Sequence, residues 1–304
     1  MSGDVSAEVR DVSTVLITGG SGFIGRNLVE QFGPRYEVLA PSHRELDLTD
    51  GDAVRAYLRA HRPDAVVHAA TKPGHRNAAD PTGLVEANTK MFFNLAGDPV
   101  LCPRMVFLST GAVYDMRHYV PLMPEEYFDA HIPPDETGFS KYVIAKYAEQ
   151  VDHVVELRPF GVFGKYEDYA IRFISNAICK TLFDLPVTLR QNRRFSYVWI
   201  DDLVRVVEHF MLAESSATAF NVTPDDTHEL LELAELVVAV SGKELPILVA
   251  EPGMGPEYSG ANGQLRREMP DLDFTPMRIA VERLFAWYSE NRDSIDRTAL
   301  LQDR

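Results

Sequence analysis

The sequence predicts an α/β fold with a doubly wound parallel sheet, because strand-like and helical segments alternate through its first half. Apolar, strand-like runs lie at 14–18, 36–40, 65–69, 105–109 and 153–158, and helical patterns lie near 22–33, 51–61, 82–96 and 138–151. The 304 residues are 45% apolar, which is enough to bury a sizeable core. Ligands of such sheets bind beyond the carboxyl ends of the strands, so the residues just after each strand are the candidates for a site.

The first strand-like run ends in a glycine-rich turn, and a helical pattern follows directly. Gly19 allows a tight turn, Gly22 lets the backbone approach a pyrophosphate, and Gly25 lets the helix pack closely on the strand. The helix N-terminus offers free N–H groups and the positive end of its dipole to an anion. A merely tight turn would not need three glycines at these offsets, so the segment predicts a Rossmann-type dinucleotide site.

Composition excludes several classes of partner. The formal net charge is −15, and Lys and Arg are scattered, which argues against nucleic acid or an anionic membrane as a partner. The two cysteines, Cys102 and Cys179, imply no disulfide framework and fit a reducing cytoplasm. No apolar run reaches membrane-spanning length, and the histidines show no metal-ligand spacing, so we expect no membrane segment and no metal.

The regular alternation fades after Gly164. A helix is expected near 168–183, a strand at 195–200, a helix at 202–212, and a further helix capped by Asp226 with Glu229 three residues on. Residues 14–165, with about 197–222, are predicted to form the dinucleotide-binding domain. Residues 166–196 and 223–292 are predicted to form a smaller, partly interleaved C-terminal substrate lobe. Residues 1–13 are expected to be a flexible tail and 293–304 a frayed one.

Six ordered motifs carry a family resemblance over nearly the whole chain. They are Thr18-Gly-Gly-Ser-Gly-Phe-Ile-Gly25, Val67-His-Ala-Ala70, Phe107-Leu-Ser-Thr-Gly-Ala-Val-Tyr114, Ser140-Lys141, Arg158-Pro-Phe-Gly-Val-Phe-Gly164 and Phe220-Asn-Val222. Together they resemble the extended short-chain dehydrogenases/reductases of the NAD-dependent epimerase/dehydratase type, which act on nucleotide-linked sugars. The stretch 44–50 is also similar to the GDP-fucose synthase and dTDP-4-dehydrorhamnose reductase branches. The resemblance implies a nucleotide-sugar substrate and a homodimer.

The resemblance also implies which residues contact the cofactor. Asp47 and Leu48 match the pair on the adenine side, and the remaining contacts fall on Gly19, Ser21, Gly22, Phe23, Ile24, Gly25, Ala69, Ala70, Lys141 and Pro159. The end of the second strand carries no acid that would hold both ribose hydroxyls of NAD. It carries Ser42, His43 and Arg44 instead, which suit the 2′-phosphate of NADP. NADP is therefore expected. The alternatives are NAD as the cofactor and Arg44 as an ordinary surface charge.

The catalytic residues of the family are a Ser/Thr, a Tyr and a Lys, and only two of these have a match. Thr110 matches the Ser/Thr and Lys141 the lysine, but Thr137 stands where the tyrosine is expected. Tyr142 and Lys146 repeat the Tyr-x-x-x-Lys spacing out of register. An aliphatic hydroxyl is a far weaker acid than a phenol, so another group must move the proton. The alternatives left open are Glu136, Tyr114 and the 72–77 loop, above all His75.

On the substrate side, the resemblance assigns diphosphate binding to Arg193 or Arg194. Gly161 replaces a substrate-contacting Asn, Ala112 lies in the motif beside the substrate, and Lys72, His75 and Arg76 add polar groups at the strand edge. The predicted activity is reduction of a keto group on a nucleotide-linked sugar, with epimerisation left open. The alternative from another class is a catalytically weakened, cofactor-binding member with a regulatory or scaffolding role.

Overall fold

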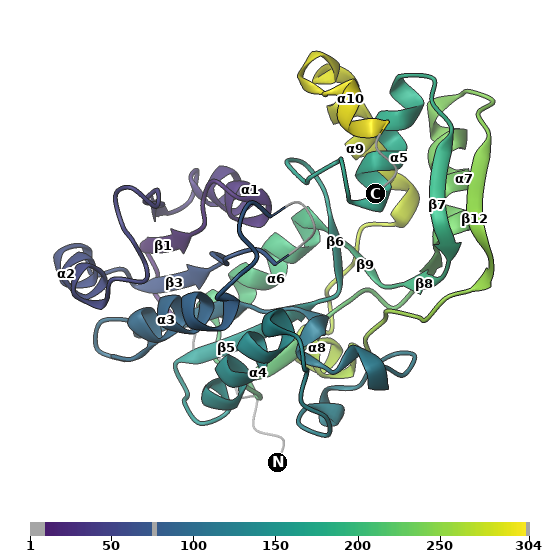
Figure 1. Cartoon of the computed structure of the whole chain (residues 1–304). Helices are drawn as coiled ribbons and strands as arrows, with labels where there is room; N and C mark the ends of the chain where they lie inside the picture. The colour runs from purple at the N-terminus through teal and green to yellow at the C-terminus, as the bar shows by residue number, and fades with distance from the viewer. Residues whose placement is uncertain (1–9, 75–77, 302–304) are drawn as a thin grey trace.

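The largest sheet of the computed structural model, which describes residues 10–74 and 78–301, is a parallel one (Figure 1). Within these residues the sheet has six strands in the order β10-β5-β4-β3-β1-β2, all paired in parallel. Their bounds are β1 Thr14–Thr18, β2 Glu37–Leu39, β3 Ala65–His68, β4 Met105–Leu108, β5 Val154–Pro159 and β10 Ala219–Val222. The predicted α/β class with a doubly wound parallel sheet is confirmed.

Helices cover both faces of this sheet. They are α1 Phe23–Phe32, α2 Gly51–His61, α3 Leu84–Ala96, α4 Glu136–Ala148 and α6 Ile200–Leu212. Successive side chains of a strand point to opposite faces, so Val15 and Ile17 pack in the core under α1 and α6, whereas Leu16 packs in the core under α2, α3 and α4. This is why the strands are apolar on both faces.

The chain reverses direction across the sheet at β1. It runs from β1 outward to β2, then returns to place β3 on the other side of β1. Such a switch point leaves a crevice at the carboxyl ends of the two strands, where ligands of open α/β sheets bind. The glycine turn after β1 and Ala69–Ala70 after β3 both lie there.

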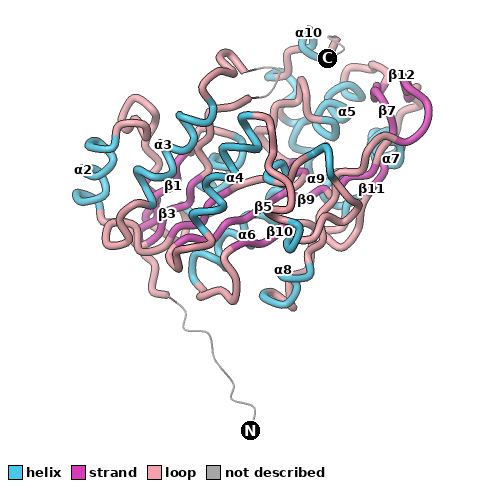
Figure 2. Tube along the Cα trace, turned by 60° about the horizontal axis from the view of Figure 1, so that its bottom comes forward, coloured by secondary structure: helices cyan, strands magenta, loops and turns pink. Residues whose placement is uncertain are grey.

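Shorter sheets and further helices lie outside the main sheet (Figure 2). In the described chain, β6 Gly161–Phe163 pairs with β9 Tyr197–Trp199, β7 Val187–Asn192 with β12 Ile247–Met254, and β8 Arg194–Phe195 with β11 His228–Glu229. The helices are α5 Phe173–Leu182, α7 Leu230–Ser241, α8 Gly263–Glu268 and α9 Met277–Glu290, with the single turn α10 Arg297–Leu300 at the end. The 3₁₀ turns are η1 Gly111–Val113, η2 Met116–His118, η3 Glu125–Tyr127 and η4 Arg292–Ser294.

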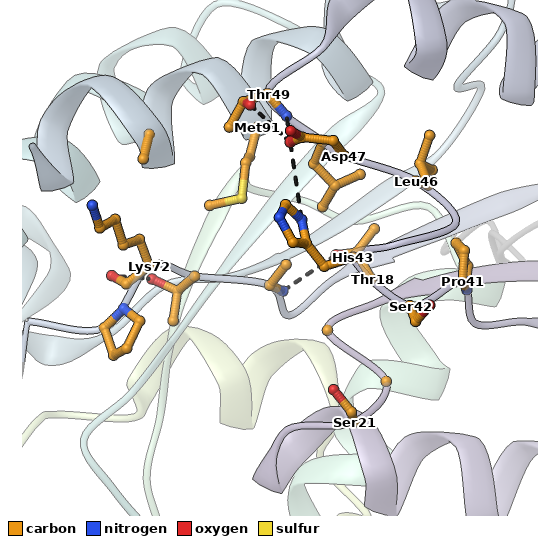
Figure 3. Close-up of a pocket in the computed structure, with 17 residues that line it drawn as sticks. Thr18, Ser21, Pro41, Ser42, His43, Leu46, Asp47, Thr49, Lys72 and Met91 are labelled. Carbon is orange, nitrogen blue, oxygen red and sulfur yellow. Dashed lines mark hydrogen bonds and ion pairs between the residues drawn. The ribbon is translucent and has the colours of Figure 1, made fainter. Parts of the chain in front are cut away.

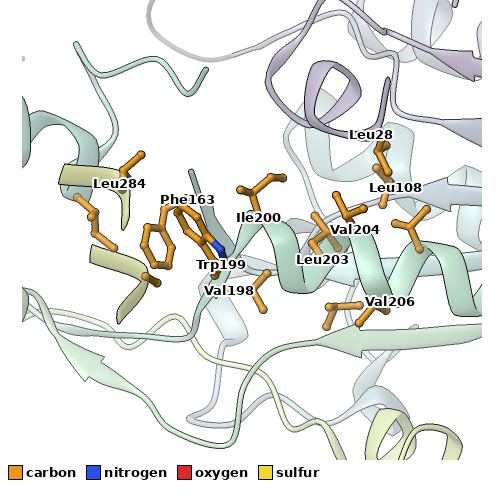
Figure 4. Close-up of a cluster of buried hydrophobic side chains, with 14 of the residues drawn as sticks. Leu28, Leu108, Phe163, Val198, Trp199, Ile200, Leu203, Val204, Val206 and Leu284 are labelled. Carbon is orange, nitrogen blue, oxygen red and sulfur yellow. The ribbon is translucent and has the colours of Figure 1, made fainter. Parts of the chain in front are cut away.

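One apolar core joins the main sheet to this second part. It runs from Leu28 of α1 through Leu203 and Ile200 of α6 to Phe163 and then Leu284 of α9 (Figure 4). All five side chains are almost completely buried. Separating the two parts would expose this shared apolar surface, so the second part is held firmly against the ends of the strands.

The ends of the chain depart from the predicted flexible tails. The backbone N–H of Arg10 donates to the Leu212 carbonyl at 2.8 Å, and Ser13 donates to Asp64 from its backbone and its hydroxyl. At the other end, Ile295 and Leu300 are buried in the main core. The tails were therefore predicted too long, because their polar composition hid these anchoring contacts. Residues 1–9 and 302–304 lie outside the described part of the chain.

Two other elements differ from the sequence-based expectation. The expected strand at 195–200 is divided into β8 and β9, because the backbone N–H of Ser196 turns to the carbonyl oxygen of Tyr258 at 3.0 Å. The cap of α7 is Glu229, not Asp226. Glu229 and Glu232 form a reciprocal capping box at the start of that helix.

Candidate active site

Two glycines at the turn after β1, Gly19 and Gly25, have no room for a side chain. Gly19 has a positive φ of 71°, and a Cβ there would lie 2.8 Å from the Ala70 backbone after β3. A Cβ at Gly25 would collide with the Gly19 carbonyl group. The two glycines therefore bring α1 and the ends of β1 and β3 close together, as the sequence predicted.

A cavity of about 440 Å³ opens beside this turn, at the carboxyl ends of β1, β2 and β3 (Figure 3). Its wall includes residues from three separate predicted segments: Gly19 and Ser21; Ser42, His43, Asp47 and Leu48; and Ala70 and Lys72. Its volume falls in the range of small-molecule sites. The Cβ-intolerant turn and the cavity above it fit the pyrophosphate and adenosine half of a dinucleotide.

The adenine-side acid has local partners. Asp47 accepts hydrogen bonds from the backbone N–H and hydroxyl of Thr49 at 2.9 and 2.7 Å, and these bonds hold its pKa below the usual range. His43 Nδ1 lies 4.0 Å from the same carboxylate, and Figure 3 shows the ring directed at it. Asp47 is therefore oriented by its own loop, with about half of its side chain exposed.

Glu45 is a residue that the sequence reasoning missed. Its carboxylate accepts hydrogen bonds from the backbone N–H and the hydroxyl of Ser42, both at 2.8 Å. These donors belong to the segment expected to hold the 2′-phosphate. Arg44 is exposed and is absent from the residues that line the cavity. The Ser-x-x-Glu spacing is a recognised capping signal and would have identified the contact.

His68 holds the ends of β1 and β3 together. Its Nδ1 shares a hydrogen bond of 2.8 Å with the Thr18 hydroxyl, which also accepts from the backbone N–H of Ala70 at 3.2 Å. Burial, together with the Lys141 charge, lowers the pKa of His68 to about 3. The ring is thus neutral at ordinary pH and has a structural role at the crevice.

The two candidate catalytic residues, Thr110 and Lys141, both lie near the end of β4. Thr110 is the cap of η1, and its Oγ1 accepts a hydrogen bond from the Ala112 backbone N–H at 3.3 Å. Lys141, on α4, donates from Nζ to the Leu108 carbonyl oxygen at 3.3 Å and is only 6% exposed. Burial lowers the pKa of Lys141 to about 8, and the Glu156 charge acts in the opposite direction.

The space beside Thr137 is occupied by the loop after β3. A Cβ on Gly74 would lie 2.6 Å from the Thr137 hydroxyl and would also meet Leu84. Thr137 is one turn from Lys141 on α4, so it shares a helix face with the lysine. The loop at Gly74 therefore packs directly against the Thr137 hydroxyl.

The described alternatives to the missing phenol already have partners. Tyr114 is buried, with 2% of the residue exposed. Its hydroxyl donates to Asn221 at 2.9 Å and accepts from Arg158 at 3.1 Å. Glu136 accepts from the Leu84 backbone N–H at 3.1 Å, and Lys72 pairs with Asp80 at 2.7 Å. His75 and Arg76 lie outside the described residues.

The second Tyr-x-x-x-Lys string lies away from these groups. Tyr142 donates to Asp129, and Lys146 pairs with Asp129 at 3.1 Å and with Glu149 at 2.8 Å. All of these side chains are partly exposed, and Phe128 packs on Tyr142. The string forms a surface network.

A second cavity, of about 830 Å³, lies between α5, β7 and β12. Arg193 lines it and stacks over the Phe195 ring, with its guanidinium carbon 5.3 Å from the ring centre. Arg194 instead pairs with Glu229 at 2.8 Å. The two predicted diphosphate arginines are thus separated, and Arg193 faces the cavity.

Gly161 has no room for a side chain. A Cβ there would lie 2.8 Å from the ring of Tyr197 and 2.9 Å from the Ser196 carbonyl. The family asparagine therefore cannot fit at this position without a shift of β9, and Tyr197 takes its space. Ala112 lies next to α4, because a Cβ on Gly138 of that helix would lie 2.8 Å from the Ala112 carbonyl oxygen.

Neither a membrane-spanning helix nor a metal-binding cluster is found in the described residues. Across residues 10–74 and 78–301, no helix is long and apolar enough to cross a membrane. In the same residues, no group of three or more His, Cys, Asp or Glu side chains is placed to hold a metal ion. Cys102 and Cys179 are both buried as free thiols.

Known proteins resemble this chain in sequence and structure. Residues 15–223 match the model of the NAD dependent epimerase/dehydratase family. A GDP-L-fucose synthase of Azorhizobium caulinodans is 43% identical over 84 residues, which is 27% of either chain. A dTDP-4-dehydro-6-deoxy-D-allose reductase of a Streptomyces species is 25% identical over 90% of this chain and 96% of its own.

A solved structure confirms the fold at greater evolutionary distance. The GDP-mannoheptose C4 reductase of Campylobacter jejuni, determined with NADP bound, superposes with a TM-score of 0.78 at 18% identity. The superposition covers 91% of this chain and 98% of the other. The Rossmann-type architecture and the second part beyond Gly164 are therefore both shared with that enzyme's fold.

Proposed function

Because the chain belongs to the NAD dependent epimerase/dehydratase family, we propose that it is an NADP(H)-dependent reductase of a 4-keto sugar carried on a nucleoside diphosphate. The arrangement of Lys141 and Thr110 around the end of β4 carries this proposal. Reductases of keto sugars also recur among its relatives, including the Streptomyces and Campylobacter proteins.

The cofactor would lie along the crevice above β1 and β3. Gly19, Ser21, Gly22 and the N-terminus of α1 would hold the pyrophosphate, with Asp47 and Leu48 beside the adenine. Ser42 and His43 line the cavity at the end of β2, and the absence of a ribose-binding acid directly at that strand end supports NADP over NAD. When bound, the reduced nicotinamide supplies a hydride to the keto carbon.

Thr110 and Lys141 would then do different work. The Thr110 hydroxyl would bind the keto oxygen and place its carbon for attack. The Lys141 ammonium would bind the nicotinamide ribose and add positive charge next to the oxygen, which becomes negative during the reaction. Both roles remain available without a tyrosine at position 137.

The nucleotide would extend into the second cavity. Arg193 faces that cavity, and its planar guanidinium suits two diphosphate oxygens at once. The cavity is separate from the dinucleotide crevice, as a ternary complex requires. The same features argue for an enzyme over a purely regulatory role, because a cofactor-binding scaffold would not need a sugar-nucleotide site.

The test is turnover with a panel of 4-keto sugars linked to GDP, dTDP and UDP. NADPH oxidation that depends on one member of this panel, with an alcohol as the product, is the expected result. Absence of oxidation with every member, while both the nucleotides and NADPH bind in calorimetry, would refute the reductase and favour a binding role.

A further inference from the structure

Tyr258 brings a phenol to Thr110 from a distant part of the chain. Its hydroxyl lies 3.4 Å from Thr110 Oγ1, across a sequence separation of 148 residues. The side chains of Tyr258 and Thr110 are both half-buried. Gly111 makes this approach possible, since a Cβ there would lie 2.8 Å from the Tyr258 oxygen.

The position of Tyr258 is determined by its backbone and by its ring. Its N–H donates to the Arg194 carbonyl at 2.9 Å, and its carbonyl accepts from Ser196 at 3.0 Å, so the segment is joined to the β8 edge of the substrate side. The ring packs on Phe160 and stacks on Tyr119, with centre distances of 5.0 and 5.3 Å. A phenol held this firmly has a defined direction toward Thr110.

The neighbouring phenol is bound elsewhere. Tyr119 donates its hydroxyl proton to the Gly111 carbonyl at 2.7 Å. Burial raises the pKa of Tyr258, while its hydrogen bond with Thr110 and the Arg172 charge act in the opposite direction. Tyr258 is therefore protonated at neutral pH, and the Thr110 hydroxyl and the Arg172 charge favour the phenolate that remains after proton transfer.

From this geometry we infer that Tyr258 is the proton donor of the reduction and stands in for the tyrosine absent at position 137. The inference rests on the proposed function. The keto carbon gains a hydride from the cofactor, the electron pair of the C=O π bond moves to oxygen, and that oxygen takes the Tyr258 proton. The ketone is reduced to an alcohol, the cofactor is oxidised by the same two electrons, and the phenolate regains a proton from water.

The experiment compares wild type with Tyr258→Phe, which keeps the ring, and with Tyr142→Phe, which removes a surface phenol. With the 4-keto nucleotide sugar that wild type reduces best, Tyr258→Phe is expected to lower kcat by about 10²–10⁴-fold. In calorimetry on the NADP⁺-loaded protein, the same variant should weaken binding of that sugar by about tenfold and leave binding of the bare nucleoside diphosphate unchanged. Tyr142→Phe should match wild type in both assays.

Thr110→Val reports on the same contact without altering the aromatic cluster. It should weaken binding of the keto sugar and spare the nucleoside diphosphate. A Tyr258→Phe variant with wild-type kcat would overturn the assignment of Tyr258 as the proton donor. A Thr110→Val variant with wild-type affinity for the keto sugar would instead contradict the role proposed for Thr110. Inactivity of wild type toward the whole panel would instead refute the proposed function itself.

Discussion

The Nζ atom of Lys141 donates a hydrogen bond to the Leu108 carbonyl oxygen at 3.3 Å and lies 4.5 Å from the centre of the Phe107 ring. This contact ties α4 to the end of β4, the middle of the sheet. A buried ammonium in this position is costly in free energy, which is why its pKa falls to about 8 from 10.5. A purely structural position would not need a charge there.

Lys141→Met is expected to abolish NADPH-dependent reduction, because the charge beside the reacting oxygen disappears. For the same reason, wild-type activity should fall as the pH rises through about 8, where Lys141 loses its proton. Lys146→Met, on the exposed network of α4, is the matched control and should retain activity. Full activity of Lys141→Met in a kcat profile against pH would contradict this role.

The lowered pKa of Lys141 also predicts how the free energy of unfolding of the cofactor-free protein depends on pH. The pKa is about 8 in the folded protein and 10.5 ordinarily, so between these values the unfolded chain binds more protons. The free energy of unfolding of wild type should therefore rise with pH over this interval, by about 3 kcal/mol relative to Lys141→Met. Denaturant titrations at pH values on both sides of the interval measure it, and parallel profiles for the two proteins would count against a depressed pKa.

Gly25→Ala is expected to remove cofactor binding, since the added methyl would collide with the Gly19 carbonyl group. The forced shift of α1 should also cost about 1–3 kcal/mol of stability. Gly263→Ala is a suitable control, because its Cβ would meet only the end of Arg267 at 3.7 Å. Calorimetry with NADPH checks the effect, and unchanged affinity in Gly25→Ala would place the cofactor elsewhere.

Coenzyme choice should respond to Glu45. The carboxylate occupies the Ser42 donors and adds negative charge near a 2′-phosphate. Glu45→Gln is therefore expected to improve the affinity for NADPH relative to NADH by about fivefold, as for an exposed charge. Arg44→Ala should act in the opposite direction and weaken NADPH alone. Equal effects of either substitution on the two coenzymes would remove the 2′-phosphate assignment.

The two adjacent arginines should differ. Arg193→Ala is expected to weaken nucleoside diphosphate binding by about 1.5–3 kcal/mol, because it removes hydrogen bonds to a charged group. Arg194→Ala should have little effect on this binding, since Arg194 pairs with Glu229 and does not line the cavity. Calorimetry with GDP, dTDP and UDP compares them, with NADPH affinity as the internal control. Greater loss in Arg194→Ala would reverse the assignment.

The first half of the fold was predictable because each strand and helix there has a local signal. The apolar strand runs, the three glycines and the helical patterns between them are all readable within a few residues. The elements beyond Gly164 carry weaker signals. β6 and β8 are too short to show a period, and the exposed, Pro- and Gly-containing β12 was not anticipated.

The residues of the candidate site likewise fall into those that a local motif predicts and those that it does not. Motif residues such as Gly19, Thr110 and Lys141 could be placed from the resemblance alone. The approach of Tyr258 to Thr110 and the pairing of Arg194 with Glu229 depend on how distant segments pack, and neither belongs to a local motif. The sequence shows a threonine at position 137 where the resemblance expects a tyrosine, but it does not show the approach of Tyr258, because Tyr258 lies 148 residues from Thr110.

The central claim is hydride transfer from a nicotinamide cofactor to the keto carbon of a nucleotide-linked sugar. Its most direct test uses NADPH deuterated at the transferable position, with mass spectrometry and NMR of the product of the active panel member. The account predicts one deuterium, bound to the carbon that carried the keto group. A product without deuterium at that carbon, or release of the label to water, would contradict it.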